Sequence, residues 1–230
     1  MLIDAHAHFN RPEELVLRQS IPTVFCGANP ETAAQVMSLK GEGMYISCGL
    51  HPWYADRWTV SDMLPWIQGS VALGEIGLDS VWTDVDMSRQ RAVFKAQLEL
   101  ATDLQLPIIL HTKGMEAEIA RTIAPIPVRK LVHWYSCAEH LEDYLLQDCY
   151  FTIGPDHAVN PAVRRVLYRA PLDRVLTETD GLDAVSWALN ETAEAADIEK
   201  TLRGELRAIA EAHGISEAEA EMRVEANLRR

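Results

Sequence analysis

The 230-residue chain has few basic residues and no long apolar run. Lysine and arginine number 21 against 34 aspartate and glutamate residues, which gives a formal net charge of −13 at pH 7. Because duplex binding depends on many lysine and arginine contacts to phosphates, this balance argues against an extended nucleic-acid-binding surface. No apolar run approaches the roughly 18 residues that a membrane span needs, and the first eight residues lack the pattern of a signal peptide. We therefore expect a cytoplasmic protein with no membrane partner and no evident obligate protein partner.

Cysteines, repeats and linkers are also scarce. The four cysteines contain no C-x-x-C pair, and three of them lie in or beside apolar runs. We expect reduced, mostly buried thiols rather than disulfides or zinc ligands. No internal repeat, low-complexity tract or linker interrupts the chain, and its 48% of hydrophobic residues suffices for a sizeable core. A single domain over residues 1–230 is the prediction.

What the sequence does contain is eight short, nearly continuous apolar runs. Such runs are typical of strands that are buried on both faces of a parallel sheet. The expected strands are Leu2–His6, Pro22–Gly27, Met44–Leu50, Val71–Ile76, Pro107–His111, Lys130–Trp134, Tyr150–Gly154 and Arg174–Glu178. Eightfold alternation of strand and helix predicts an α/β fold of the (β/α)8 TIM barrel type. A doubly wound open sheet is the alternative, but it usually has a glycine-rich phosphate loop where this chain has His-Ala-His.

Helix signals separate these runs. Asn29-Pro30 and Asn160-Pro161 each indicate an N-cap followed by proline at the first helical position. The longest helix is expected over about Met87 to Leu106, with one apolar stripe made of Val93, Ala96, Leu100 and Leu104. Beyond the last strand, residues 191–230 predict two extra C-terminal helices. Gly214 would end the first of these, and Ser216 with Glu219 would form a capping box for the second.

Most of the histidines fall at the ends of expected strands. Those ends meet at the C-terminal face of a barrel, where the active sites of this fold lie. Imidazole is a ligand suited to zinc, iron, nickel or manganese. Four histidines at converging strand ends therefore predict a metal site more readily than four unrelated buried side chains. The four are His6, His8, His111 and His133.

Two carboxylates complete this pattern. Glu75 lies in an apolar strand between Gly74 and Gly77, and a buried acid is costly unless it is paired or coordinates a metal. The glycines would allow close backbone approach beside it. Asp180 closes the eighth apolar run, where it could ligate a metal or merely cap the next helix. Glu178 has the same parity one layer lower, so one of these two carboxylates could support the other.

In series, these motifs resemble those of the TatD family of metal-dependent deoxyribonucleases, within the amidohydrolase superfamily. The motifs occur in the family's order and spread over nearly the whole chain. They are DAHAH at 4–8, GLHP at 49–52, GEIGLD at 74–79 and TETD at 177–180, together with the strand-end residues His111 and His133. The resemblance implies a (β/α)8 barrel with one or two divalent ions, whose identity as zinc, magnesium or manganese stays open.

The resemblance also implies a role for each residue. His6 and His8 would hold a first metal with Asp180, His111 and His133 would complete a second site, and Glu75 would bridge the two. Paired ions can activate a water and stabilise a leaving oxygen, so Asp180, as general base, and Glu75 are the expected catalytic residues. Asp4 would orient a ligand histidine. His51 would contact the substrate phosphate rather than a metal, with a structural strand-end histidine as the competing interpretation.

The chain departs from the family pattern where a substrate would lie. Leu182 stands where the family usually has proline, Lys113 replaces a common arginine, and Trp134 follows His133. Lys113 could still meet a phosphate as a point charge, and Trp134 could stack an unpaired base or simply pack at the barrel rim. Two substrates therefore stay open. One is a DNA end, single-stranded and attacked exonucleolytically; the other is an amide, ester or lactone bond in a small molecule.

Overall fold

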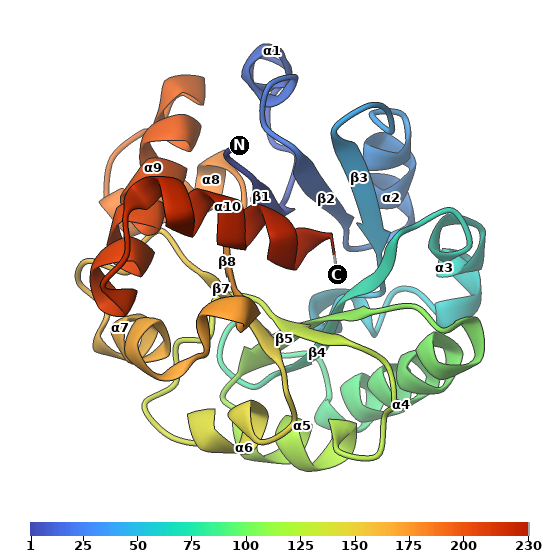
Figure 1. Ribbon diagram of the computed structural model, residues 1–230. Helices are drawn as coiled ribbons and strands as arrows, with labels where there is room; N and C mark the ends of the chain where they lie inside the picture. The colour runs from blue at the N-terminus through green and yellow to red at the C-terminus, as the bar shows by residue number, and fades with distance from the viewer. Residues whose placement is uncertain (230) are drawn as a thin grey trace.

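The computed structural model describes residues 1–229, in which eight strands form one parallel sheet in the order of the chain. Each apolar run predicted from the sequence contains or overlaps one of these strands, and helices surround them (Figure 1). The predicted (β/α)8 barrel is therefore confirmed. The strands are β1 (Asp4–Ala7), β2 (Thr23–Gly27), β3 (Met44–Cys48), β4 (Ala72–Asp79), β5 (Ile108–Lys113), β6 (Lys130–Val132), β7 (Tyr150–Ile153) and β8 (Val175–Thr177).

The last strand returns to the first through hydrogen bonds that involve both backbone and side chains. The hydroxyl of Thr177 donates to the carbonyl oxygen of Ile3 at 2.7 Å. The backbone N–H of Thr179 donates to Asp4 Oδ1 at 2.9 Å. One residue further on, the N–H of Asp180 donates to the carbonyl oxygen of His6 at 3.0 Å. These contacts close the barrel along the edge where the DAHAH and TETD segments meet.

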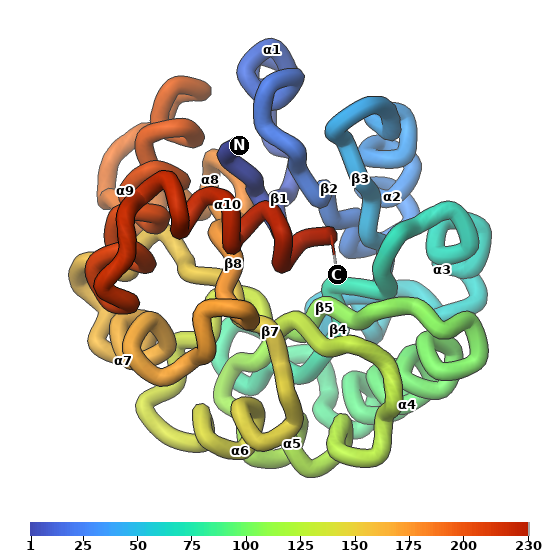
Figure 2. Tube along the Cα trace, viewed as in Figure 1, coloured from blue at the N-terminus to red at the C-terminus, as the bar shows by residue number. Residues whose placement is uncertain are grey.

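Helices lie around the outside of the strands in chain order, as the path of the tube shows (Figure 2). Asn29 and Asn160 accept hydrogen bonds from the backbone of the helices that follow them, as predicted. Gly214 ends α9 and Ser216 caps α10, which confirms the two extra C-terminal helices. The helices are α1 (Glu14–Arg18), α2 (Pro30–Met37), α3 (Val60–Ile67), α4 (Met87–Leu104), α5 (Glu116–Ile123), α6 (Leu141–Leu145), α7 (Pro161–Arg169), α8 (Leu182–Leu189), α9 (Ala195–His213) and α10 (Glu217–Leu228), with short 3-10 helices η1 (Pro52–Tyr54) and η2 (Leu172–Arg174).

The buried face of α4 differs from the predicted stripe. Leu104 is 40% exposed, and the helix instead buries Phe94, Leu98 and Ala101 together with two glutamines, Gln90 and Gln97. The side chain of Gln97 bonds both the N–H and the carbonyl oxygen of Leu50, at 2.7 and 3.0 Å. That of Gln90 bonds the N–H and the carbonyl oxygen of Asp79, both at 2.9 Å. Since these amides satisfy backbone groups at the ends of strands, polar residues occupy core positions that an apolar pattern does not identify.

Strand boundaries also shift at the carboxyl ends. β4 extends to Asp79, so Glu75 lies inside the strand rather than near its end. Gly77 permits this extension because a Cβ at its position would overlap the carbonyl oxygen of His111 on the neighbouring strand. β8 ends at Thr177, which leaves Asp180 in the segment beyond it.

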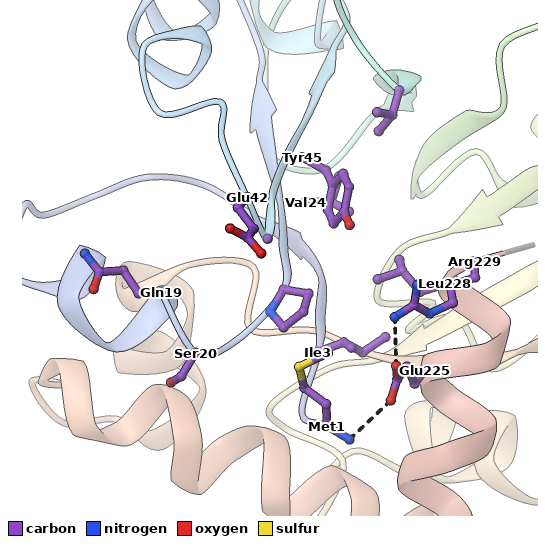
Figure 3. A pocket seen from close by; sticks show the side chains of 13 residues that line it. Met1, Ile3, Gln19, Ser20, Val24, Glu42, Tyr45, Glu225, Leu228 and Arg229 are labelled. Atoms are coloured by element: carbon purple, nitrogen blue, oxygen red, sulfur yellow. Dashed lines mark hydrogen bonds and ion pairs between the residues drawn. The ribbon is translucent and has the colours of Figure 1, made fainter.

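The opposite end of the barrel is covered by α10, which crosses it in Figure 1. A cavity of about 710 Å³ lies there, between the last turn of α10 and the amino ends of the first strands (Figure 3). The amino group of Met1 at its edge pairs with Glu221 at 2.6 Å and Glu225 at 3.3 Å. This cavity is lined by none of the predicted site residues. Within the described part of the chain, no helix has the length and apolar character needed to cross a membrane.

Candidate metal centre

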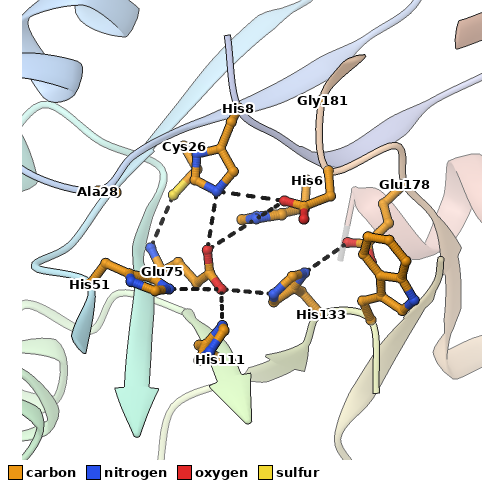
Figure 4. Close-up of polar contacts among 12 residues, drawn as sticks. His6, His8, Cys26, Ala28, His51, Glu75, His111, His133, Glu178 and Gly181 are labelled. Atoms are coloured by element: carbon orange, nitrogen blue, oxygen red, sulfur yellow. Dashed lines mark hydrogen bonds and ion pairs between the residues drawn. The ribbon is translucent and has the colours of Figure 1, made fainter. Parts of the chain in front are cut away.

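The six residues predicted to bind metal come together at the carboxyl ends of the strands. Figure 4 shows the four histidines around the side chain of Glu75. Glu75 Oε2 lies 3.4 Å from His6 Nε2 and 3.3 Å from His8 Nε2. Its other oxygen, Oε1, lies 2.7 Å from His111 Nδ1 and 2.7 Å from His133 Nε2. The two oxygens of one carboxylate thus face two different pairs of histidines.

Asp180 joins the first of these pairs. Its Oδ1 lies 3.4 Å from His6 Nε2 and 3.5 Å from His8 Nε2. The backbone of Asp180 is left-handed, with φ 56°, a conformation that aspartate tolerates better than most residues. Gly181 follows with little room, because a Cβ there would lie 2.5 Å from the carbonyl oxygen of His8. Strand closure and this tight turn together position the carboxylate over the DAHAH segment.

The donor atoms of the cluster fit a cation. Among the described residues, His6 Nε2 and Asp180 Oδ1 are buried without a hydrogen bond, although these two atoms lie within ion-pair distance of each other. Buried polar atoms normally have partners, and a divalent ion would supply them. Three overlapping groups offer ligand atoms within 4.8 Å of one another: His6, His8, Cys26 and Glu75; His6, His133 and Asp180; and His51, Glu75 and His111. Nitrogen and carboxylate donors of this kind suit zinc and manganese.

Charge in the cluster is set by the mutual attraction of these groups. Burial opposes ionisation of Glu75, but His133, His51 and His111 hold the pKa of this carboxyl well below its usual range. Burial and His133 lower the pKa of His6, and contacts with Asp180 and Glu75 outweigh them and raise it to about 9. Glu75 is therefore an anion at neutral pH, as a bridging ligand must be.

Two acidic side chains support the outer nitrogens of the histidines. Asp79 Oδ2 lies 2.9 Å from His111 Nε2, and Glu178 Oε2 lies 3.5 Å from His133 Nδ1. Such partners fix the orientation of metal-binding imidazoles. The sequence predicts Glu178 only as a mutual support with Asp180, and it predicts no role for Asp79. The signal for Asp79 was available, because it is the last residue of the GEIGLD motif.

Asp4 has different partners from those expected. Among the described residues it forms no hydrogen bond with a histidine ring. Its carboxylate pairs with the buried Arg18 at 2.8 Å and accepts hydrogen bonds from the N–H and the hydroxyl of Thr179 at 2.9 and 2.6 Å. Asp4 therefore positions the segment that carries Asp180, not the ring of a ligand. The prediction failed because the register between the first and last strands is not contained in the local motif.

His51 and Cys26 lie closer to the cluster than expected. His51 is 5% exposed, and its Nε2 lies 3.5 Å from Glu75 Oε1. Burial lowers the pKa of His51 to about 4, which leaves a neutral ring beside Glu75 and His111. The sulfur of Cys26 accepts a hydrogen bond from the N–H of Glu75 at 3.1 Å. Both residues were assigned away from the metal, whereas the structure places them next to its candidate ligands.

The remaining predicted substrate residues lie at the rim. Lys113 is partly exposed and its ammonium group donates to the hydroxyl of Ser136 at 3.2 Å. Trp134 is partly buried, and its indole N–H donates to Asp156 Oδ1 at 2.7 Å. Its ring packs on Gly154, where a Cβ would overlap the indole. Lys113 thus retains an accessible charge, whereas the indole N–H of Trp134 is already bonded to Asp156.

An eight-stranded barrel with histidines and carboxylates gathered at its carboxyl ends defines a divalent-metal-dependent hydrolase. Comparison with known families agrees. The TatD related DNase family matches residues 3–230, and the chain belongs to this family.

Individual relatives extend this comparison. The chain is 29% identical over 204 residues to the uncharacterized metal-dependent hydrolase YabD of Bacillus subtilis, covering 78% of this chain and 80% of that protein. It is 28% identical over 172 residues to the 3'-5' ssDNA/RNA exonuclease TatD of Edwardsiella piscicida, covering 68% and 66%. Among solved structures, the TatD homologue YjjV of Escherichia coli K12 superposes with a TM-score of 0.83 at 22% identity, covering 98% of this chain and 95% of that one. The structural likeness supports the fold.

Proposed function

We propose that this hydrolase cleaves phosphodiester bonds of DNA, exonucleolytically and from single-stranded ends. The observation that carries the proposal is the division of Glu75 between two histidine pairs, at 3.3–3.4 Å on one oxygen and 2.7 Å on the other. Two such sites suit displacement at phosphorus, in which both the attacking and the leaving oxygen carry charge. The name of the Edwardsiella relative, a single-strand exonuclease, supports the same substrate.

His6, His8 and Asp180 would hold one ion, His111 and His133 the other, and Glu75 both. When bound, divalent ions of this kind act as Lewis acids and lower the pKa of a coordinated water. Zinc, magnesium and manganese are all candidates. The number of histidines favours zinc or manganese over magnesium, which prefers oxygen ligands.

Asp180 would accept the proton of the attacking water. Burial opposes its ionisation, but His6, His133 and His8 lower the pKa of this carboxyl, so it is ionised and able to act as a base. The water oxygen would form a bond to phosphorus as the bond from phosphorus to the leaving sugar oxygen breaks. That sugar oxygen would then take the proton that Asp180 accepted, which returns Asp180 to its ionised form. Atoms and charge balance with no further reactant.

Lys113, at the end of β5 two residues beyond His111, would attract the phosphate as a point charge. The proposed phosphate contact of His51 would need the ring to turn from Glu75 toward substrate, so this role is the weaker of the two. Trp134 would contribute ring surface only, because its N–H is committed to Asp156.

A second candidate is hydrolysis of an amide, ester or lactone bond in a small molecule by the same centre. The net charge of −13 favours it, because an extended phosphate-binding surface needs many cations. The partly exposed ammonium group of Lys113 would serve a small anionic substrate as well as a DNA end. The cytoplasmic location expected from the sequence stays a prediction.

The deciding experiment uses protein stripped of metal and reloaded with zinc, magnesium or manganese in turn. A short end-labelled single-stranded DNA is offered, with the His6→Ala variant as the blank. Metal-restored shortening of the strand, absent from the variant, is expected, and the ladder of products identifies the end attacked. Failure to cleave with any ion despite stoichiometric bound metal would overturn the nuclease proposal in favour of the small-molecule hydrolase.

A further inference from the structure

Three tryptophans meet above the metal centre. Trp82 follows β4, Trp134 follows His133, and Trp187 lies on α8 after Asp180. The ring of Trp187 packs edge to face against Trp82, with centroids 6.5 Å apart at 88°, and against Trp134, at 5.8 Å and 73°. Because β4 and β8 are four strands apart in an eight-stranded barrel, they lie on opposite sides of it. The segments that follow these two strands therefore meet across the mouth of the barrel, which is the end where the strands have their carboxyl termini. We call Trp82, Trp134 and Trp187 the tryptophan arch.

The arch is anchored on one side and open on the other. Trp134 is fixed by its hydrogen bond to Asp156 and by its packing on Gly154. In contrast, Trp82 is 55% exposed and Trp187 is 62% exposed. Large aromatic rings usually bury most of their surface, and neither of these two packs into the core. Their exposed indole rings are therefore available to contact a ligand that binds at this end of the barrel.

A cation lies beside this surface. The ammonium nitrogen of Lys113 is 5.6 Å from the centroid of the Trp82 ring, within the range of a cation–π contact. An aromatic face next to a positive charge is complementary to a flat, uncharged ring linked to an anion. A nucleotide has this chemistry, with a base to stack on indole and a phosphate to meet the ammonium group.

The arch is also tied to the metal centre. The backbone N–H groups of Val81 and Trp82 donate to Asp79 Oδ1 at 2.7 and 2.8 Å. The other oxygen of the same carboxylate lies 2.9 Å from His111 Nε2. Asp79 therefore fixes the segment of Trp82 relative to a candidate metal ligand. A base held at the arch would have its phosphate at a defined position over the centre.

We propose that Trp82 and Trp187 form a stacking subsite for an unpaired nucleobase, and that this subsite selects single-stranded over duplex ends. The inference rests on the proposed phosphodiesterase function. A base within a duplex has both faces covered by its neighbours, so only an unstacked base can lie against indole. Stacking on the arch then contributes to DNA affinity, because a chain of net charge −13 has no extended basic surface for phosphate contacts.

The test measures binding to the metal-loaded protein of a short, fluorescently labelled single strand with phosphorothioate linkages, which resist cleavage. A second strand is identical but lacks the bases of its terminal nucleotides, and a third is a blunt duplex. We expect Trp187→Ala and Trp82→Ala each to weaken binding of the normal strand by about 5- to 150-fold, the range of one base–aromatic stack. Binding of the abasic strand should change less than twofold.

Tyr168→Ala is the matched control, because Tyr168 is 57% exposed on α7 and outside the arch; it should leave both strands unaffected. Equal loss for normal and abasic strands, or no loss for either, would overturn the stacking subsite, as would wild-type protein that binds the duplex as tightly as the single strand.

The two proposals fail separately. A protein that cleaves DNA but binds it without dependence on the arch loses only the subsite, and one that cleaves no DNA with any metal loses the nuclease function whatever the binding shows.

Discussion

Asp180 and His6 are joined through both backbone and side chain: the N–H of Asp180 donates to the carbonyl oxygen of His6 at 3.0 Å, and its Oδ1 lies 3.4 Å from His6 Nε2. The backbone bond closes the barrel between its last and first strands. The side-chain contact places the proposed general base beside a proposed ligand. Closure of the fold and assembly of the centre therefore depend on the same pair of residues.

Replacing Asp180 by asparagine should abolish most activity without unfolding the protein. Asparagine tolerates the left-handed backbone found here, with φ 56°, and it keeps the N–H bond to His6. It loses the negative charge and the ability to accept a proton. We expect kcat for the metal-dependent reaction to fall by about 10²- to 10⁴-fold, with a melting temperature close to that of the wild type.

The matched control is Asp183→Asn. Asp183 lies three residues further on, at the start of α8, where its exposed side chain pairs with Arg11 at 3.1 Å. Activity of this variant should stay within about twofold of the wild type, since a surface ion pair contributes roughly 0–1 kcal/mol. Equal loss in both variants would show that charge near the mouth, rather than a base at Asp180, controls the rate.

Replacing Glu75 by glutamine should lower metal content at both proposed sites. The carboxylate faces His6 and His8 with one oxygen and His111 and His133 with the other. An amide keeps the shape but loses the charge that two cations would share. Metal analysis after dialysis should give less than half of the wild-type content. Retention of one full equivalent would limit Glu75 to a single ion.

Arg18 should contribute strongly to the free energy of unfolding, although it is not a candidate metal ligand. It is fully buried, with Nη1 2.8 Å from Asp4 and Nε 2.7 Å from Glu14. Arg18→Met would leave two buried carboxylates without a cation, a change that costs about 3–5 kcal/mol in the free energy of unfolding. Urea unfolding checks this figure. Arg91→Met, which breaks the exposed pair with Glu118, should cost less than about 1 kcal/mol.

The fold and most of the cluster could be predicted because their signals are local. Apolar runs define buried strands, and residues at the ends of parallel strands must converge. This is why His6, His111 and Asp180 could be assigned to one site from the sequence. The resemblance to a known family assigned them to ions.

What the sequence did not predict depends on register and long-range packing. Asp4 binds Thr179 across the closing edge, and its partner could not be known without the alignment of β1 with the segment after β8. Gln97 occupies a core position on α4 because it satisfies the backbone of Leu50. Trp82 and Trp187 meet only because their segments lie across the mouth from each other. Each relationship joins residues distant in the chain.

The stability of the protein should depend on pH through Glu205, a fully buried residue of α9. Its Oε2 accepts the N–H of Glu178 at 3.1 Å, while Oε1 has no hydrogen bond among the described residues. Burial, followed by the nearby charges of Glu178 and Asp4, raises the pKa of this carboxyl well above 4.5. Below the unfolded-state pKa, both states carry the proton and the group has no effect. As the pH rises above it, the unfolded chain loses the proton while the folded chain retains it, so the free energy of unfolding falls.

Glu205→Gln removes this dependence, because an amide accepts the same hydrogen bond without titrating. We therefore expect the variant to be more stable than the wild type at pH 8 and nearly equal to it at pH 4.5. Urea unfolding at the two pH values gives the difference. Glu211→Gln, an exposed position on the same helix, should change stability by less than about 0.5 kcal/mol at either pH. If the stability advantage of the Glu205→Gln variant over the wild type grows as the pH rises, burial keeps this carboxyl protonated in the folded protein. If the variant is instead less stable than the wild type at pH 8, a partner stabilises the ionised carboxylate.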